Sequence, residues 1–143
     1  MMARVKIEIA GKVLTCITIP VRITDINYGN HTGNDALVGL LHEARAAWLR
    51  QNNFTELDID GTGLILSDLL VNFKRESFYG DMLDISLYAT DISRKSFDLI
   101  YAVTTKRDNI KIEIAVAKTT MISYDYSLKK VIDLPQGLVM LIS

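Results

Sequence analysis

The segment Asn34–Arg50 constrains the fold most, because it combines helical periodicity with apolar residues on most of its faces. One face repeats apolar side chains at i, i+3 and i+4 spacing: Leu37, Leu40, Leu41, Ala44 and Trp48. The other faces also carry apolar residues: Val38, Ala46, Ala47 and Leu49. A helix that is apolar around much of its girth is usually enclosed by other structure. We therefore expect a central helix, about 25 Å long, whose leucines and tryptophan belong to the core.

Patterns typical of strands lie on both sides of this segment. Before it, Val5–Ile9 and Val13–Ile19 alternate apolar and polar residues around a glycine turn, which predicts a short hairpin. After it, four runs have strand character: Leu64–Phe73, Leu83–Tyr88, Phe97–Thr105 and Ile110–Met121. The alternation changes parity within the last run, which indicates a bulge, and Arg107–Asn109 is typical of a hairpin turn. The tail Pro135–Ile142 fits either a short helix or an extended arm.

These elements predict one α+β domain over residues 1–143, with the helix packed on a curved antiparallel sheet of about five strands. A single open sheet has two unpaired edges and covers a helix only partly. Pairing of an edge with a second copy removes both problems. We therefore expect at least a homodimer, and a homotetramer built as a dimer of dimers.

Composition narrows the functional classes. The formal net charge is -1, and basic patches with interleaved aromatic residues are missing, so nucleic acid is not an expected partner. The first ten residues lack the basic and continuous apolar regions of a signal peptide, and no segment reaches the roughly twenty apolar residues of a membrane span. A single cysteine, Cys16, and two histidines offer no zinc spacing. We expect a cytoplasmic protein that needs no metal or cofactor and binds no membrane.

The run Val21–Asn34 leads directly into the helix and is the expected functional site. It brings a carboxylate, three carboxamides, an imidazole and two glycines into one polar turn. Helix N-termini present backbone N–H groups that lack intrahelical acceptors, together with the positive end of the helix dipole. Such a place suits a polarised carbonyl or an anion, with the amides of Thr32, Gly33 and Asn34 as donors. The residues Thr32–Asp35 also fit a capping box.

Three separated parts of the chain carry a family pattern: Asp25–Asn34, Glu43–Arg45, and Phe78–Asp81 followed by Ser93–Phe97. They resemble the hotdog-fold acyl-thioester hydrolases, in particular the 4-hydroxybenzoyl-CoA thioesterase-like group. The motifs of that group read Asp-x-Asp-x-x-Gly-His-x-Asn-Asn, Glu-Ala-Arg, Tyr-x-Asp and Arg-Lys-Ser-Phe. The resemblance implies a hotdog fold and the hydrolysis of an acyl-CoA thioester without metal or redox cofactor.

The resemblance also implies catalytic roles, with one departure. The carboxylate that is often catalytic in the family corresponds to Asn27, and a carboxamide cannot act as a base. Two carboxylates remain near the motif, and we place Glu43, expected to be buried among apolar helix residues, slightly ahead of Asp25 as the base. Asn27 and His31 would then orient the water or the carbonyl.

Each of these residues also has a purely structural interpretation. Asp25 and Asn27 can be turn residues that bond to their own backbone. His31 can be an ordinary loop histidine, and Glu43 can simply hold the motif through an ion pair with Arg22 or Arg45. Four basic residues are similar in position to those that line the path of the CoA phosphates in the family, although basic turns are often merely solvated: Lys74, Arg75, Arg94 and Lys95.

The leading hypothesis is an acyl-CoA thioesterase, with leucines and isoleucines that mildly favour an aliphatic acyl group. One rival is a module that binds acyl thioesters without hydrolysing them. Another is a different hotdog reaction, such as the dehydration of a 3-hydroxyacyl thioester, which needs a His/Asp or His/Glu pair at the substrate. An acyl carrier protein is an alternative to CoA as the acyl donor.

Overall fold

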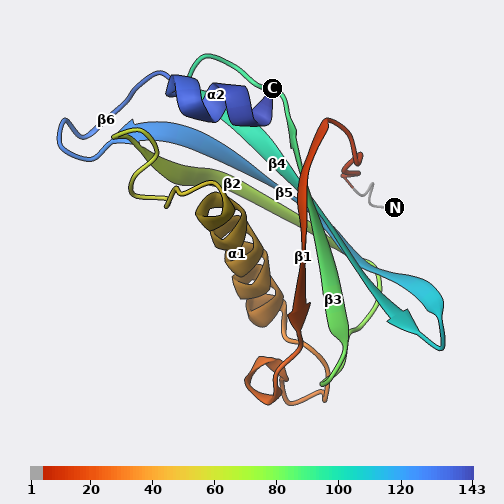
Figure 1. Cartoon of the computed structure of the whole chain (residues 1–143). Coiled ribbons are helices and arrows are strands. Elements are labelled where there is room, and N and C mark those ends of the chain that lie inside the picture. Colours follow the sequence, from red (N-terminus) through yellow and green to blue (C-terminus); the bar gives the residue numbers. More distant parts are fainter. Residues whose placement is uncertain (1–4) are drawn as a thin grey trace.

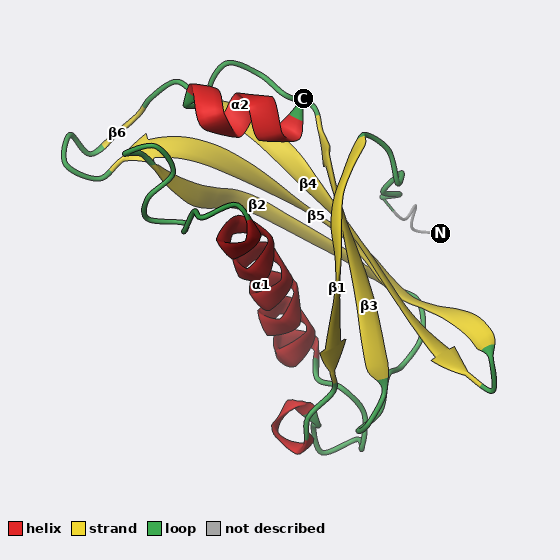
Figure 2. Cartoon of the chain, in the orientation of Figure 1, coloured by secondary structure: helices red, strands yellow, loops and turns green. Residues whose placement is uncertain are grey.

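The computed structural model describes residues 5–143 and contains one antiparallel sheet with a long helix against one of its faces (Figures 1 and 2). In chain order the elements are β1 (Lys12–Pro20), the 3-10 turn η1 (Ile23–Asp25), α1 (Asn34–Gln51), β2 (Gly63–Phe73), β3 (Met82–Thr90), β4 (Ser96–Arg107), β5 (Ile110–Asp125), β6 (Lys130–Val131) and α2 (Gln136–Ile142). This arrangement is the α+β class expected from the sequence.

The strands pair antiparallel in the spatial order β1-β3-β4-β5-β2, and the short β6 adds to β5. The chain enters at one edge with β1, crosses through α1 to the opposite edge at β2, and then returns to β3 beside β1. This path places the loop before α1 and the loop between β2 and β3 at the same end of the sheet, where Val21 N donates to Asp81 O at 2.8 Å. Two segments that are distant in sequence therefore form one end of the molecule.

The core lies between one face of α1 and the sheet. Trp48 is 1% exposed and meets Phe97 of β4 edge to face, with ring centroids 6.5 Å apart. Burial of an apolar side chain of this kind stabilises the fold by about 1.5–3 kcal/mol. Polar or small residues occupy the opposite, exposed face of α1: Asp35, Gly39, His42, Glu43 and Arg50. The helix is thus covered on one side within the chain, whereas the sequence pattern predicted fuller enclosure.

Strand β5 contains a bulge as predicted, but at Ile114, two residues before the position after Val116 at which the alternation changes parity. Val103 of β4 pairs with Ala115 and the next residue, Thr104, pairs with Glu113, so Ile114 is the extra residue. Its carbonyl oxygen accepts hydrogen bonds from Lys74 N at 2.8 Å and from Arg75 N at 3.2 Å. The bulge therefore fixes the point at which the chain leaves β2 and begins the loop toward β3.

The C-terminal tail, which the sequence left undecided, is helix α2. Leu138 and Ile142 are fully buried against the core, and this pattern explains why the segment packs as a helix. Lys12 Nζ donates to the carbonyl oxygens of Leu141 and Ser143, at 3.1 and 2.9 Å, at the end of α2 where cations are favourable.

The predicted N-terminal hairpin is wrong. Strand β1 forms, but Val5–Ile9 has no regular secondary structure. Val5 is 65% exposed and Ile9 is 47% exposed, so the apolar positions of this alternating run do not pack on the core. Over residues 5–143, none of the helices has the length and apolar character required to cross a membrane.

Candidate active site

The loop before α1 is folded around Asp25 rather than extended. η1 covers Ile23–Asp25, and the carboxylate of Asp25, which is 6% exposed, accepts a hydrogen bond from Arg22 N at 2.8 Å and two from the Arg22 guanidinium. Burial raises the pKa of Asp25, but the hydrogen bonds and charge of Arg22 outweigh this effect and lower its pKa below the usual range. Asp25 O also accepts the amide of Gly33 at 3.0 Å. Asp25 therefore holds the loop together.

Asn27 forms the next turn. Its side-chain Oδ1 accepts a hydrogen bond from Gly29 N at 2.9 Å, and its backbone N–H donates to His31 O at 2.9 Å. This is the turn interpretation of Asn27 that the sequence left open. A Cβ on Gly29 would come within 3.1 Å of His31 Nε2, so the turn packs closely against the imidazole. The turn thereby limits where the ring of His31 can lie.

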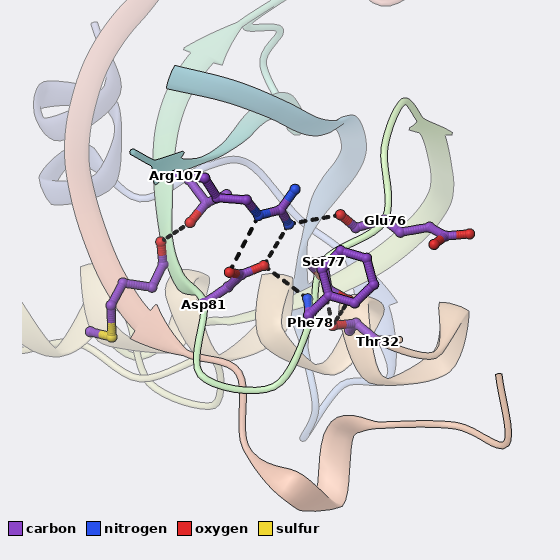
Figure 3. Close-up of polar contacts among 8 residues, drawn as sticks. Thr32, Glu76, Ser77, Phe78, Asp81 and Arg107 are labelled. Carbon is purple, nitrogen blue, oxygen red and sulfur yellow. Dashed lines mark hydrogen bonds and ion pairs between the residues drawn. The ribbon is translucent and has the colours of Figure 1, made fainter. Parts of the chain in front are cut away.

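Arg107 at the end of β4 holds the loop between β2 and β3 (Figure 3). Its guanidinium donates to the carboxylate of Asp81 at 2.6 Å and to Glu76 O at 3.0 Å, and it lies 4.9 Å from the ring centre of Phe78. The Asp81 carboxylate also accepts Phe78 N at 2.8 Å. Partial burial raises the pKa of Asp81, but the hydrogen bonds from Arg107 and Phe78 prevail and lower it.

This pair predicts a pH-dependent contribution to stability. Because the pKa of Asp81 is lower in the folded chain than in the unfolded chain, where it is about 3.9, the contribution is present above that pH and is lost as the pH falls through the folded value. We expect Asp81→Asn to reduce the free energy of unfolding by about 1–2 kcal/mol at pH 7. The difference from wild type should shrink in urea titrations below about pH 4.

The matched control for this prediction is Asp108→Asn, an exposed aspartate in the adjacent β4–β5 turn, which should change stability by less than about 0.5 kcal/mol. A deficit in Asp81→Asn that stays constant from pH 7 to pH 2.5 would show that the charge of Asp81 is not the source of the stabilisation.

Thr32 and Ser77 tie the two loops together. Thr32 N donates to Ser77 O at 2.8 Å, Thr32 Oγ1 donates to the same oxygen at 3.1 Å, and Ser77 Oγ donates to Thr32 Oγ1 at 2.6 Å. Both side chains are at least nine-tenths buried. The predicted capping box is therefore wrong: the N-cap of α1 is Gly33, without a side-chain cap, because the hydroxyl of Thr32 is used to bind the second loop.

A cavity of about 190 Å³ lies where these loops meet the start of α1. Its lining combines the helix start, the second loop and the bulge: His31, Thr32, Asn34, Leu37, Phe73, Lys74, Arg75, Glu76, Ser77 and Ile114. The amide of Thr32 donates to Ser77 O, and that of Gly33 donates to Asp25 O. Within residues 5–143, the amide of Asn34 has no acceptor. Of the three amides expected to polarise a carbonyl, the one at Asn34 is available.

The other predicted residues are distributed unevenly. Lys74 and Arg75 line the cavity. Asp25 and Asn27 do not line it, and their hydrogen bonds lie within the loop before α1. Glu43 is exposed on α1, so the expectation that it is buried is wrong. Its apolar neighbours in the sequence predicted burial, but Glu43 lies on the exposed face of α1.

Arg94 and Lys95 lie in the turn between β3 and β4, at the far end of β3 from Asp81. Nine residues of strand separate these ends by about 30 Å. Arg94 Nε pairs there with Asp133 at 3.2 Å. One chain therefore does not bring these two basic residues to the cavity.

A second hollow, about 610 Å³ in volume, adjoins the cavity and shares Lys74 and Arg75 with it. Lys111 of β5 and Arg107 also line this hollow. Arg107 is engaged with Asp81, and Lys74 Nζ lies 3.4 Å from the Glu113 carboxylate. The lining of this hollow contains four basic residues and two acidic ones, Asp108 and Glu113, so basic side chains outnumber acidic ones next to the cavity.

Two polar residues of the lining were missed by the sequence analysis, namely Glu76 and Ser77. Both come from the loop between β2 and β3, immediately before a segment that the family pattern includes. The polar run Lys74–Ser77 between an apolar strand and Phe78 was the available signal, but only the folded chain places it against the start of α1.

Residues 21–140 match the family model described as the thioesterase-like superfamily. Among solved structures, the PA2801 protein from Pseudomonas aeruginosa is similar with a TM-score of 0.83 and 20% identity, over 92% of this chain and 100% of that one. The 1,4-dihydroxy-2-naphthoyl-CoA thioesterase Slr0204 from Synechocystis has a TM-score of 0.79 and 21% identity, over 89% and 93%. The DHNA-CoA thioesterase from Staphylococcus aureus has a TM-score of 0.74 and 18% identity, over 84% and 80%. A comparison with curated protein sequences finds no match.

These likenesses, together with one helix packed on a curved antiparallel sheet, define a hotdog-fold domain of the thioesterase type. Because the family model covers most of the chain, the assignment does not depend on the solved structures alone. The chain belongs to the thioesterase-like superfamily.

Proposed function

We propose that this chain is an acyl-CoA thioesterase, which hydrolyses an acyl thioester to a free acid and a thiol. One observation carries the proposal: the start of α1, where the Asn34 amide has no acceptor among the described residues, opens into a cavity that also receives the imidazole of His31. Thioester hydrolysis needs a hydrogen-bond donor for the developing oxyanion and a base for water, and the Asn34 amide and the His31 imidazole are groups suited to these two roles.

In this proposal the thioester carbonyl enters the cavity with its oxygen toward the Asn34 amide. The positive end of the α1 dipole stabilises the negative charge that develops on the oxygen during attack. His31 supplies the base, because neither Asp25 nor Glu43 lines the cavity. Leu37 and Ile114 supply apolar contact for the acyl group.

The carrier end of the substrate would follow the basic surface next to the cavity. Lys74, Arg75 and Lys111 present cationic groups along the second hollow, and such groups suit the phosphates of CoA. The substrate classes named for two similar structures, both CoA thioesters, support this choice over a carrier protein. Arg94 and Lys95 could contribute only from another chain.

The proposal includes a homodimer. β2 is an edge strand, and three large apolar residues on it are more than 40% exposed: Leu66, Leu69 and Phe73. An exposed apolar edge strand is a surface on which a second copy of the same strand can pair. Phe73 also lines the cavity, so a partner that covers β2 would help to close the site.

The test is thiol release from a panel of acyl-CoAs of different length and aromatic content. We expect release of one thiol for each free acid formed. Tight binding of every acyl-CoA without release would favour the binding module, and formation of an enoyl thioester from a 3-hydroxyacyl-CoA would favour the dehydratase. The dehydratase remains an alternative because that reaction needs a His/Glu or His/Asp pair, and His31 Nε2 lies 3.8 Å from Glu76 Oε1.

A further inference from the structure

A histidine and a carboxylate face each other at the cavity. His31 Nε2 lies 3.8 Å from Glu76 Oε1, and the two side chains come from the loops that Thr32 and Ser77 tie together. His31 is 30% exposed and Glu76 is 62% exposed, so both can be reached by solvent. Since Arg107 binds the backbone oxygen of Glu76, the main chain at this position is held while its carboxylate projects freely.

The distance between these two groups suits a bridging water. At 3.8 Å the ring nitrogen and the carboxylate oxygen are too far apart for a direct hydrogen bond. They are nevertheless closer than twice a hydrogen-bond length of about 2.8 Å, so one water molecule can contact both atoms at once. Both residues line the cavity, so a water held between them would be next to a substrate bound there.

The other nitrogen of His31 favours the tautomer that this arrangement needs. Nδ1 lies 3.3 Å from Thr32 O, a carbonyl that can only accept, so we assign the proton of the neutral ring to Nδ1. The lone pair then resides on Nε2, the atom next to Glu76. When Nε2 takes a proton, both N–H groups of the imidazolium have an oxygen acceptor nearby.

No other carboxylate in the described part of the chain occupies an equivalent place. Glu76 is the one acidic residue among those that line the cavity in residues 5–143. Asp25 is bound by Arg22, Glu43 lies on the exposed face of α1, and Glu113 pairs with Lys74 in the second hollow. Glu76 is therefore the carboxylate available at the cavity in the described part of the chain.

We propose that Glu76 and His31 together bind the water that attacks the thioester, an inference that rests on the proposed function. His31 Nε2 takes one proton as the water oxygen bonds to the carbonyl carbon, and the carbonyl electron pair moves to the oxygen at the Asn34 amide. The Glu76 carboxylate accepts a hydrogen bond from the other O–H of the water, which stays on the attacking oxygen, and stabilises the imidazolium. Collapse re-forms the C=O bond and breaks the C–S bond, and the departing sulfur takes the proton from His31.

The first test compares substitutions of two exposed glutamates, one at the cavity and one away from it. Glu76→Gln should lower kcat about 10- to 100-fold with KM within about threefold of wild type, because water activation is impaired while substrate contacts remain. Glu76→Asp should retain part of the lost rate. The control Glu8→Gln, which changes an exposed carboxylate that lines neither the cavity nor the second hollow, should stay within about twofold in kcat.

The second test is chemical rescue, which a merely structural role would not show. Formate should restore kcat of Glu76→Ala at least tenfold, since the exposed position admits a small carboxylate, and chloride at equal ionic strength should not. A wild-type chain that hydrolyses thioesters while Glu76→Gln remains within twofold, or a Glu76→Ala variant that formate does not rescue, would overturn the role of Glu76. A wild-type chain that releases no thiol overturns the proposed function, and this role falls with it.

Discussion

Replacement of His31 by glutamine should lower kcat/KM for thiol release from an acyl-CoA by about 10²–10³-fold, because it removes the base that we place next to the bound carbonyl. The fold should survive, since the side chain makes one long contact to Thr32 O at 3.3 Å and lies at the rim of the cavity. Circular dichroism and thermal unfolding of the variant should match wild type. We therefore expect His31→Gln to lose activity without losing stability.

The chain provides its own control for this prediction. His42 is the other histidine; it lies on the exposed face of α1 and pairs with Glu56 at 3.0 Å, away from the cavity. His42→Gln should leave kcat/KM within about twofold of wild type. Equal losses in the two variants, or full activity in His31→Gln, would contradict the assignment of the base.

Replacement of Glu56 by alanine should reduce the free energy of unfolding by about 3 kcal/mol, the largest stability effect that we expect from a charged residue. Arg45 is 5% exposed, and its Nε donates to Glu56 Oε1 at 3.0 Å. Its Nη1 donates to Tyr101 Oη at 3.0 Å, so the tyrosine hydroxyl is left to donate to Thr119 at 2.8 Å. Without the Glu56 carboxylate, the guanidinium stays buried without a counterion.

The matched control is Glu43→Ala, which removes a carboxylate from the exposed side of α1, the helix that carries Arg45. It should change stability by less than about 0.5 kcal/mol in urea unfolding. Equal losses in the two variants would mean that Arg45 does not depend on Glu56. A gain on replacing both Arg45 and Glu56 with apolar residues is compatible with the account, because buried ion pairs are often no more stable than apolar contacts.

The long elements were predictable because their signals are local. The spacing of Leu37, Leu41 and Trp48 depends only on the helical repeat, and the change of parity after Val116 depends only on the two-residue repeat of a strand. The family motifs then gave the arrangement of the elements. The hairpin at Val5–Ile9 failed because an alternating pattern does not reveal whether a run has a partner strand and a core to cover.

The site was only partly predictable because its contacts are long-range. Arg45 interrupts an apolar helix face, and its burial depends on Glu56 and on Tyr101, which is 56 residues further along the chain. Thr32 looked like a helix cap, but its hydroxyl binds Ser77, 45 residues away. For Glu76 the local signal was only the polar run Lys74–Ser77, which does not show where the loop lies in the folded chain. What the sequence did locate was the end of the helix at which these groups meet.

The most direct measurement of the central claim is the rate of thiol release by the wild-type protein, compared between an acyl-CoA and the same acyl group on N-acetylcysteamine. The account predicts hydrolysis of the acyl-CoA at least about 10⁶-fold above the uncatalysed rate. It also predicts a lower kcat/KM for the truncated thioester, because that compound lacks the phosphates that Lys74, Arg75 and Lys111 would bind. Saturable binding of acyl-CoAs of every length without any release of thiol would contradict it.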